Sequence, residues 1–170
     1  MDQKIRINGI KLSHELVQIN LLNRCFPPDS RFLFFRLLAQ NQINIPFVLA
    51  TGMGEKIQGS CCVAAEDAKR TKQLVAREPD LKETIEFISS VGALSVFPHQ
   101  SKLKLLGLCV YILGKVRLPL YGMATSISSL TFITDYLQLD GAASVLLKYL
   151  DLPVNHAPFR PEIQVIQQKR

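Results

Sequence analysis

Two degenerate copies of one pattern occur in this chain, at residues 26–76 and 97–152. Each copy opens with Phe-Pro-x-x-Ser, at residues 26–30 and 97–101, and continues into an apolar run typical of a buried helix. The later landmarks of each copy are a proline among apolar residues and an aspartate that opens a second helix: Pro46 and Asp67, then Pro119 and Asp140. The repeat constrains the fold strongly, because both copies have to form the same kind of unit.

Apolar periodicity between these landmarks predicts the order strand, helix, strand, strand, helix, strand, twice over. In the first copy we expect strands at 15–22, 43–51, 57–65 and 84–89, and helices at 30–40 and 67–77. In the second copy we expect strands at 93–97, 116–126, 129–137 and 162–167, and helices at 101–114 and 140–150. A short strand or hairpin at 5–12 precedes both copies.

This order is that of the ferredoxin-like split βαβ unit. The sequence therefore predicts an α+β protein of two ferredoxin-like (βαββαβ) units in tandem, residues 1–88 and 89–170, with antiparallel sheets and helices on one face. The other face and the edge strands need a cover, either the sister unit or a second chain. Helical spacing favours burial of four residues on the first helix: Phe32, Phe35, Leu38 and Ala39.

The charge of the chain does not indicate a nucleic-acid partner. There are 20 Lys and Arg against 14 Asp and Glu, a net charge of +6, but the basic residues are scattered singly. A solvated surface explains such scattering better than a phosphate-binding face does. Aromatic residues are sparse on the expected strands, and no Lys/Arg-Gly-Phe-Gly-Phe-like segment occurs, so an RNA-binding sheet is not expected either.

The chemistry-bearing residues do not form a recognised catalytic or metal motif. The four cysteines lack a Cys-x-x-Cys pair, and Cys61 and Cys62 should point to opposite faces of a strand, so neither zinc nor disulfides are expected. The histidines are not at metal-site spacing, and no Walker loop or Gly-x-Ser-x-Gly occurs. We expect no enzyme activity, no metal and no cofactor, and this cysteine usage suits the cytoplasm.

A membrane location is not expected. The N-terminal residues lack the apolar stretch of a signal peptide. The apolar run at residues 105–114 is about half the roughly 20 residues that a bilayer-spanning helix needs.

Several segments resemble those of a known regulatory module. Residues 42–45, Gln-Ile-Asn-Ile, resemble the Gly-Ile-Asn-Ile that leads into the second strand of that module, and residues 127–136 resemble its third strand. Residues 26–30 lie where its strand-to-helix turn lies, and Asp67 and Asp140 where its second helix begins. On these residues, and over roughly 14–152, the chain resembles the tandem ACT domains in the regulatory region of aspartate kinases.

The resemblance implies a non-catalytic module that binds an amino acid or related small molecule at an interface between domains. It also implies paired units in a homodimer and regulation of an attached or associated enzyme, here a possible separate chain. The alternative is a structural dimerisation or interaction module without a ligand.

In such a module the strand-to-helix loop directs free backbone N–H groups and a helix N-terminus at a ligand carboxylate. The corresponding loop residues are Asp29, Ser30 and Arg31 in the first unit, and His99, Gln100, Ser101 and Lys102 in the second. Side chains that could complete the polar contacts are Thr51, Thr125 and Ser126. Neither loop has the usual glycine, and prolines 27, 28 and 98 remove donors, so ordinary N-caps at the two serines are the alternative.

Overall fold

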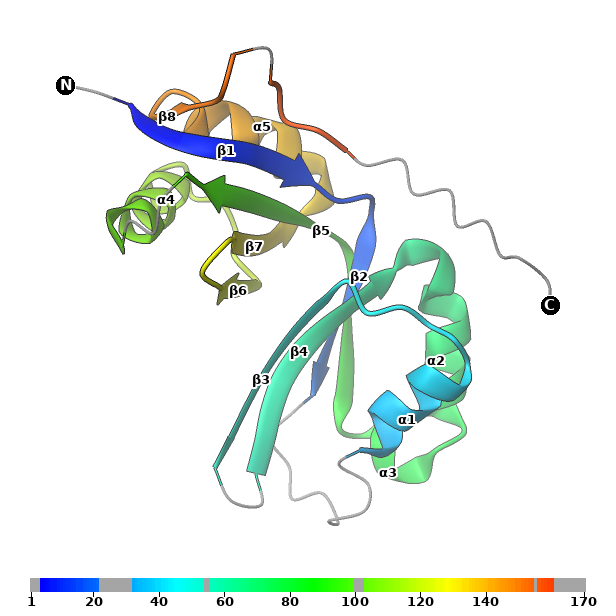
Figure 1. Ribbon diagram of the computed structural model, residues 1–170. Coiled ribbons are helices and arrows are strands. Elements are labelled where there is room, and N and C mark those ends of the chain that lie inside the picture. The colour runs from blue at the N-terminus through cyan, green and yellow to red at the C-terminus, as the bar shows by residue number, and fades with distance from the viewer. Residues whose placement is uncertain (1–3, 22–31, 54–55, 100–102, 155, 161–170) are drawn as a thin grey trace.

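A single 14-residue strand, β5 (Ile85–Pro98), runs through the molecule and belongs to both of its halves (Figure 1). The computed structural model describes residues 4–21, 32–53, 56–99, 103–154 and 156–160. Within them the fold is α+β, as the sequence predicted, with eight strands joined in one sheet and helices packed against it. The sheet has the strand path β3-β4-β2-β5-β1-β8, and β7 and β6 branch from β5.

The first half of the sheet is formed by the beginning of β5 and three earlier strands. These are β2 (Leu16–Leu21), β3 (Phe47–Met53) and β4 (Lys56–Ala64). All neighbouring pairs are antiparallel, and β3 is the edge strand. Pro46 directly precedes β3, which agrees with the expectation that proline lies at a sheet edge.

The second half is formed by the end of β5 and four further strands. These are β1 (Ile5–Leu12), β6 (Gly122–Thr125), β7 (Leu130–Asp135) and β8 (Leu150–Asp151). β7 and β1 flank the end of β5 on its two sides, and β8 lies parallel to β1. The N-terminal strand thus pairs in the second half, and the predicted boundary at residues 88–89 falls inside β5. The division into two domains stays a prediction.

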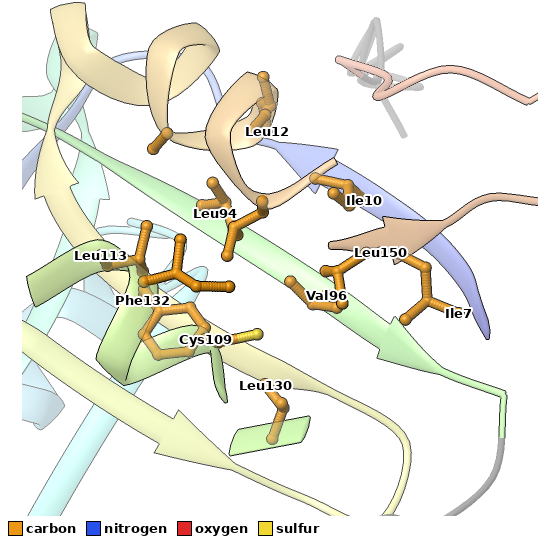
Figure 2. Packing of buried hydrophobic residues seen from close by; sticks show 14 of the residues in the cluster. Ile7, Ile10, Leu12, Leu94, Val96, Cys109, Leu113, Leu130, Phe132 and Leu150 are labelled. Carbon is orange, nitrogen blue, oxygen red and sulfur yellow. The ribbon is translucent and has the colours of Figure 1, made fainter. Parts of the chain in front are cut away.

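Each half has its own helices and its own apolar core. α1 (Leu33–Gln40), α2 (Ala68–Ala76) and α3 (Pro79–Lys82) cover the first half. α4 (Leu103–Lys115) and α5 (Leu139–Leu146) cover the second, with short 3-10 turns before α2 and α5 at Ala65–Asp67 and Tyr136–Gln138. Figure 2 shows the second core, where Leu94 and Val96 of β5 point into the same space as Cys109 and Phe132.

A third apolar cluster closes the helix-free side of the sheet. It contains Leu16, Phe47, Cys62, Val91 and Ile133, which come from strands of both halves. The two halves therefore cover each other there, as the sequence analysis required of any such pair of sheets. Cys61 belongs to the first core instead, so the two neighbouring cysteines do point to opposite faces.

One extra residue in β5 keeps all the helices on one face of the sheet. Ile88 lies opposite Gln18, whereas Val91 lies opposite Leu16, so β5 bulges between them. Ser90 has φ of 57°, the left-handed conformation that such bulges use. Without the bulge, residues 87 and 94 would face opposite sides, because alternate residues of a strand do.

Some local predictions were wrong. The strands expected at 84–89 and 93–97 are the single strand β5, because a bulge and not a turn accommodates residues 89–90. Phe32 is 68% exposed and Ala39 is exposed, while Phe34 and Leu38 form the buried stripe of α1. The strand expected from residue 116 begins at Gly122. The strand expected at 162–167 lies outside the described residues.

Candidate functional site

The start of the second strand-to-helix loop is held by β1. β5 ends at Pro98, and His99 follows as an exposed residue. The Asn8 side chain donates from Nδ2 to the Pro98 carbonyl at 3.0 Å, and its Oδ1 lies 2.9 Å from His99 Nδ1. Because Oδ1 is an acceptor, Nδ1 of His99 must carry the proton and donate.

Sequence reasoning missed Asn8. The register between β1 and β5 shifts at this residue, which frees its side chain to reach the loop. The signal that could have found it is the Asn-Gly pair at residues 8–9, since this pair is unusual inside a regular strand and is typical of a bulge or turn.

The structure brings Thr125 and Ser126 to the same end of the sheet as His99. Val96 of β5 pairs with Leu130 of β7, and Leu130 pairs with Thr125 of β6. The β6–β7 turn and the loop after Pro98 therefore lie at one end of the second half. Thr125 and Ser126 are both exposed there.

The Ser126 hydroxyl already has a structural role. It accepts the backbone N–H groups of Ser128 at 3.3 Å and Ser129 at 3.1 Å, which closes the turn. Its Oγ is also 3.0 Å from Oγ of Ser129. The Thr125 hydroxyl is therefore better placed than Ser126 to contact a molecule at this end.

The first candidate loop lies mostly outside the described residues. Its three predicted site residues, Asp29, Ser30 and Arg31, are not among the described residues. The same is true of Gln100, Ser101 and Lys102 in the second loop. In β3, Thr51 follows Ala50, which shares a row of the sheet with Gly59 and Leu21. Leu21 is the last residue of β2, so Thr51 lies at the end from which residues 22–31 continue.

The two candidate loops lie at opposite ends of β5. The first begins beside Ile85, which pairs with Leu21, and the second begins after Pro98. At about 3.3 Å per residue, a straight strand of this length spans roughly 40 Å. One small molecule cannot reach both loops of the same chain.

A polar bridge connects the two halves across the helix-free side. Gln18 of β2 is 1% exposed, and its Nε2 donates to Asn20 Oδ1 at 2.8 Å and to the Tyr121 carbonyl at 3.2 Å. The Tyr121 hydroxyl donates to Asp135 at 2.7 Å, and this hydrogen bond to the carboxylate raises the pKa of Tyr121. Gln18 Oε1 is buried and has no partner within the described part of the chain.

The described cysteines are unsuited to nucleophilic or metal chemistry. Burial raises the pKa of Cys61, Cys62 and Cys109 to about 12, so all three thiols are protonated at neutral pH. Among the described residues, no group of three or more His, Cys, Asp or Glu side chains is arranged to hold a metal ion. No described helix is long and apolar enough to cross a membrane.

Comparisons with known proteins identify the fold. No protein-family model and no curated protein sequence matches this chain. A structure of aspartokinase alpha and beta subunits aligns with TM-score 0.73 and 18% identity, covering 84% of this chain and 97% of that chain. The ligand-free regulatory subunit of aspartate kinase from Thermus thermophilus aligns with TM-score 0.71 and 16% identity, with the same coverage.

A third structure, E. coli aspartokinase III in complex with lysine and aspartate, aligns with TM-score 0.63 and 12% identity. The alignment covers 87% of this chain and 34% of the kinase chain. At these identities the comparisons establish the fold alone. The chain has the fold of aspartate kinase regulatory regions, which confirms the resemblance that the sequence indicated.

Proposed function

We propose that this chain is a regulatory module of the tandem ACT type, without catalytic activity of its own, that binds an amino acid or a related small molecule. One observation carries the proposal: the chain aligns over 84% of its length with nearly all of a free-standing aspartate kinase regulatory subunit.

The two units of the proposal are residues 1–88 and 89–170, each a ferredoxin-like sheet with helices on one face. The strand orders β3-β4-β2-β5 and β6-β7-β5-β1 support two such sheets, with β5 shared between them and β1 in the second. In this description β1 crosses from the first unit and completes the sheet of the second. This arrangement links the units, since the second sheet includes β1 from the first unit and both sheets share β5.

In the second unit the ligand carboxylate would meet backbone N–H groups of residues 100–102 at the beginning of α4. Asn8 and His99 would fix the entry of this loop, and the Thr125 hydroxyl would offer a polar contact from the neighbouring turn. In the first unit the backbone N–H groups of residues 29–31 would bind the carboxylate, and Thr51 would offer the polar contact. The position of the two loops at opposite ends of β5 supports two separate sites in each chain.

Regulation requires that the ligand bind one conformation of the protein more tightly than another. The coupling free energy between effector binding and the regulated activity is typically about 1–3 kcal/mol. The Gln18–Tyr121 bridge and the third apolar cluster are the contacts through which one half would sense the other. The regulated partner would be an enzyme, either a separate chain or a part of the same protein. The bound lysine and aspartate of E. coli aspartokinase III support an amino acid as the ligand class.

A thermal-shift screen of the chain against the twenty amino acids tests the proposal. A ligand at a hundred times its dissociation constant should raise the free energy of unfolding by about 2.7 kcal/mol. His99→Ala and Asn8→Ala should reduce the shift for a ligand bound in the second unit. His156→Ala is the matched control, because His156 is another exposed loop histidine that bonds only locally to the Val154 carbonyl. Flat melting curves for every amino acid would count against the proposal.

A second function, dimerisation without a ligand, is favoured by the edge strand β3. Val48 and Leu49 are 53% and 36% exposed on it, and a seven-residue edge strand offers free backbone groups for pairing. We expect a homodimer by sedimentation, and Val48→Lys/Leu49→Lys should shift it toward monomer. A stable dimer without any amino-acid response would favour this second function.

A further inference from the structure

A shallow apolar groove lies between the end of α4 and the turn that follows α5. It has a volume of about 230 Å³. Its lining residues are Ile112, Lys115, Val116, Val145, Lys148 and Tyr149. α4 is 13 residues long, about 20 Å at 1.5 Å per residue, and Lys115 is its last residue. The groove is therefore at the opposite end of α4 from the loop that contains His99, and it is distinct from both candidate ligand loops.

Large apolar side chains are exposed to solvent around the groove, whereas the solvent-facing side of a helix is usually polar. Val116 is 48% exposed, Tyr149 40% and the neighbouring Tyr111 61%. α4 also exposes Gly107 and Gly114, and an added Cβ would meet no atom within 4 Å at either position. Glycine weakens a helix interior relative to alanine, and packing within the described chain does not require it at these positions.

The charges at the groove have one sign. Both charged residues of the lining are lysines. Lys115 also lies 5.3 Å from the centre of the Tyr111 ring. Cations favour helix C-terminal ends, which explains one lysine at the end of α4. It does not explain the exposed apolar side chains between the lysines.

This chemistry selects among possible occupants. A second copy of the chain docked through the same face would bring lysines against lysines, which is unfavourable. The groove is also smaller than the roughly 300–1,000 Å³ typical of small-molecule sites. An extended or helical protein segment with one apolar anchor between carboxylates fits both the apolar floor and the lysine rim.

We propose that the α4–α5 groove is a docking site for an acidic amphipathic segment of another protein. An apolar side chain of that segment lies between Val116 and Tyr149, and flanking carboxylates pair with Lys115 and Lys148. This docking goes beyond the proposed effector binding and does not depend on it.

The experiment selects peptides on the full chain from a phage-displayed library of random dodecapeptides and then measures binding of the synthesised peptides by calorimetry. We expect selected peptides to carry Asp or Glu around a large apolar residue. The double variant Lys115→Glu/Lys148→Glu should bind them about tenfold more weakly or worse, since two attractive charges become repulsive. Raising the salt concentration should weaken binding to the original chain.

The matched control is Lys69→Glu/Lys82→Glu, which changes net charge equally at exposed lysines of α2 and α3 in the first half. It should bind the peptides as the original chain does. All four lysines are exposed, and each variant replaces one lysine at a helix C-terminal end, Lys115 or Lys82, so the two variants should melt at similar temperatures. The proposal is overturned if no acidic-apolar peptides are selected, if both variants lose binding equally, or if Lys115→Glu/Lys148→Glu alters self-association instead. An unchanged amino-acid response in that variant separates the docking site from the effector sites.

Discussion

Gly92→Ala should destabilise the protein, because Leu139 and Tyr136 pack directly against this glycine and leave no room for a methyl group. A Cβ at residue 92 would lie 2.5 Å from Leu139 Cδ1, 3.1 Å from Leu139 Cγ and 3.2 Å from Tyr136 Cδ2. Leu139 is fully buried at the start of α5 and cannot turn into solvent. Overpacking of this kind costs about 1–3 kcal/mol. For a chain of this length, 2 kcal/mol lowers the Tm by about 4–8 °C.

The assay is thermal and urea unfolding of four variants beside the original chain: Gly92→Ala, Gly122→Ala, Leu139→Ala and the Gly92→Ala/Leu139→Ala double variant. Gly122→Ala is the matched control in the same half, since its Cβ would meet Ile133 and Phe47 at ordinary contact distances of 3.5 Å and longer. It should be neutral or gain up to about 0.5–1 kcal/mol. In the Leu139→Ala background the clash is gone, so Gly92→Ala should cost far less there than in the original chain. Equal costs in both backgrounds, or a fully stable Gly92→Ala, would refute the reasoning.

Three further predictions concern other parts of the molecule. Gly107→Ala should raise the free energy of unfolding by up to about 1 kcal/mol, since its Cβ enters open space on α4, and a lower urea midpoint would contradict this. The buried thiols keep their protons above pH 9 whereas unfolded thiols release them, so unfolding free energy should fall with rising pH above 9. Each of Cys61, Cys62 and Cys109 should lower the unfolding free energy by about 1.4 kcal/mol per pH unit there. Urea unfolding measured between pH 8 and 10.5 tests this, and an unfolding free energy that does not decline would show that the folded thiols are not held protonated. Arg160→Ala should cost about 1–3 kcal/mol, because it removes a partly exposed ion pair with Asp140, a hydrogen bond to the Ser13 carbonyl and a contact with the Tyr136 ring. An unchanged urea midpoint would contradict this.

The sequence predicted the helices and the β3–β4 and β6–β7 strand pairs between them because landmarks recur in both copies. The adjacent cysteines correctly indicated a two-sided strand at 57–65. The phase of α1 was wrong because nearly every residue from 32 to 39 is apolar, so several stripes fit the helical period equally well. Only contact with β2 and β4 decides that Phe34 and Leu38 are the buried ones.

The pairing of β1 could not be predicted from local pattern. Residues 5–12 read as a strand wherever they pair, and their partner is the end of β5, more than 80 residues further along the chain. The same limit applies to the candidate site. Asn8 reaches Pro98 and His99 only because β1 lies there, and Gln18 reaches Tyr121 only because the two helix-free faces meet. Tertiary contacts of this kind leave no periodic signal in the sequence.

The most direct test of the proposed regulatory function is a titration of the isotopically labelled full chain with each amino acid, followed by amide NMR shifts. We expect saturable changes for at least one amino acid, concentrated in residues 98–102 and 125–126 or in residues 22–31 and around Thr51. Amides at the far end of α4 near Lys115 should stay unchanged. No saturable change with any amino acid, or changes confined to other surfaces, would contradict the account.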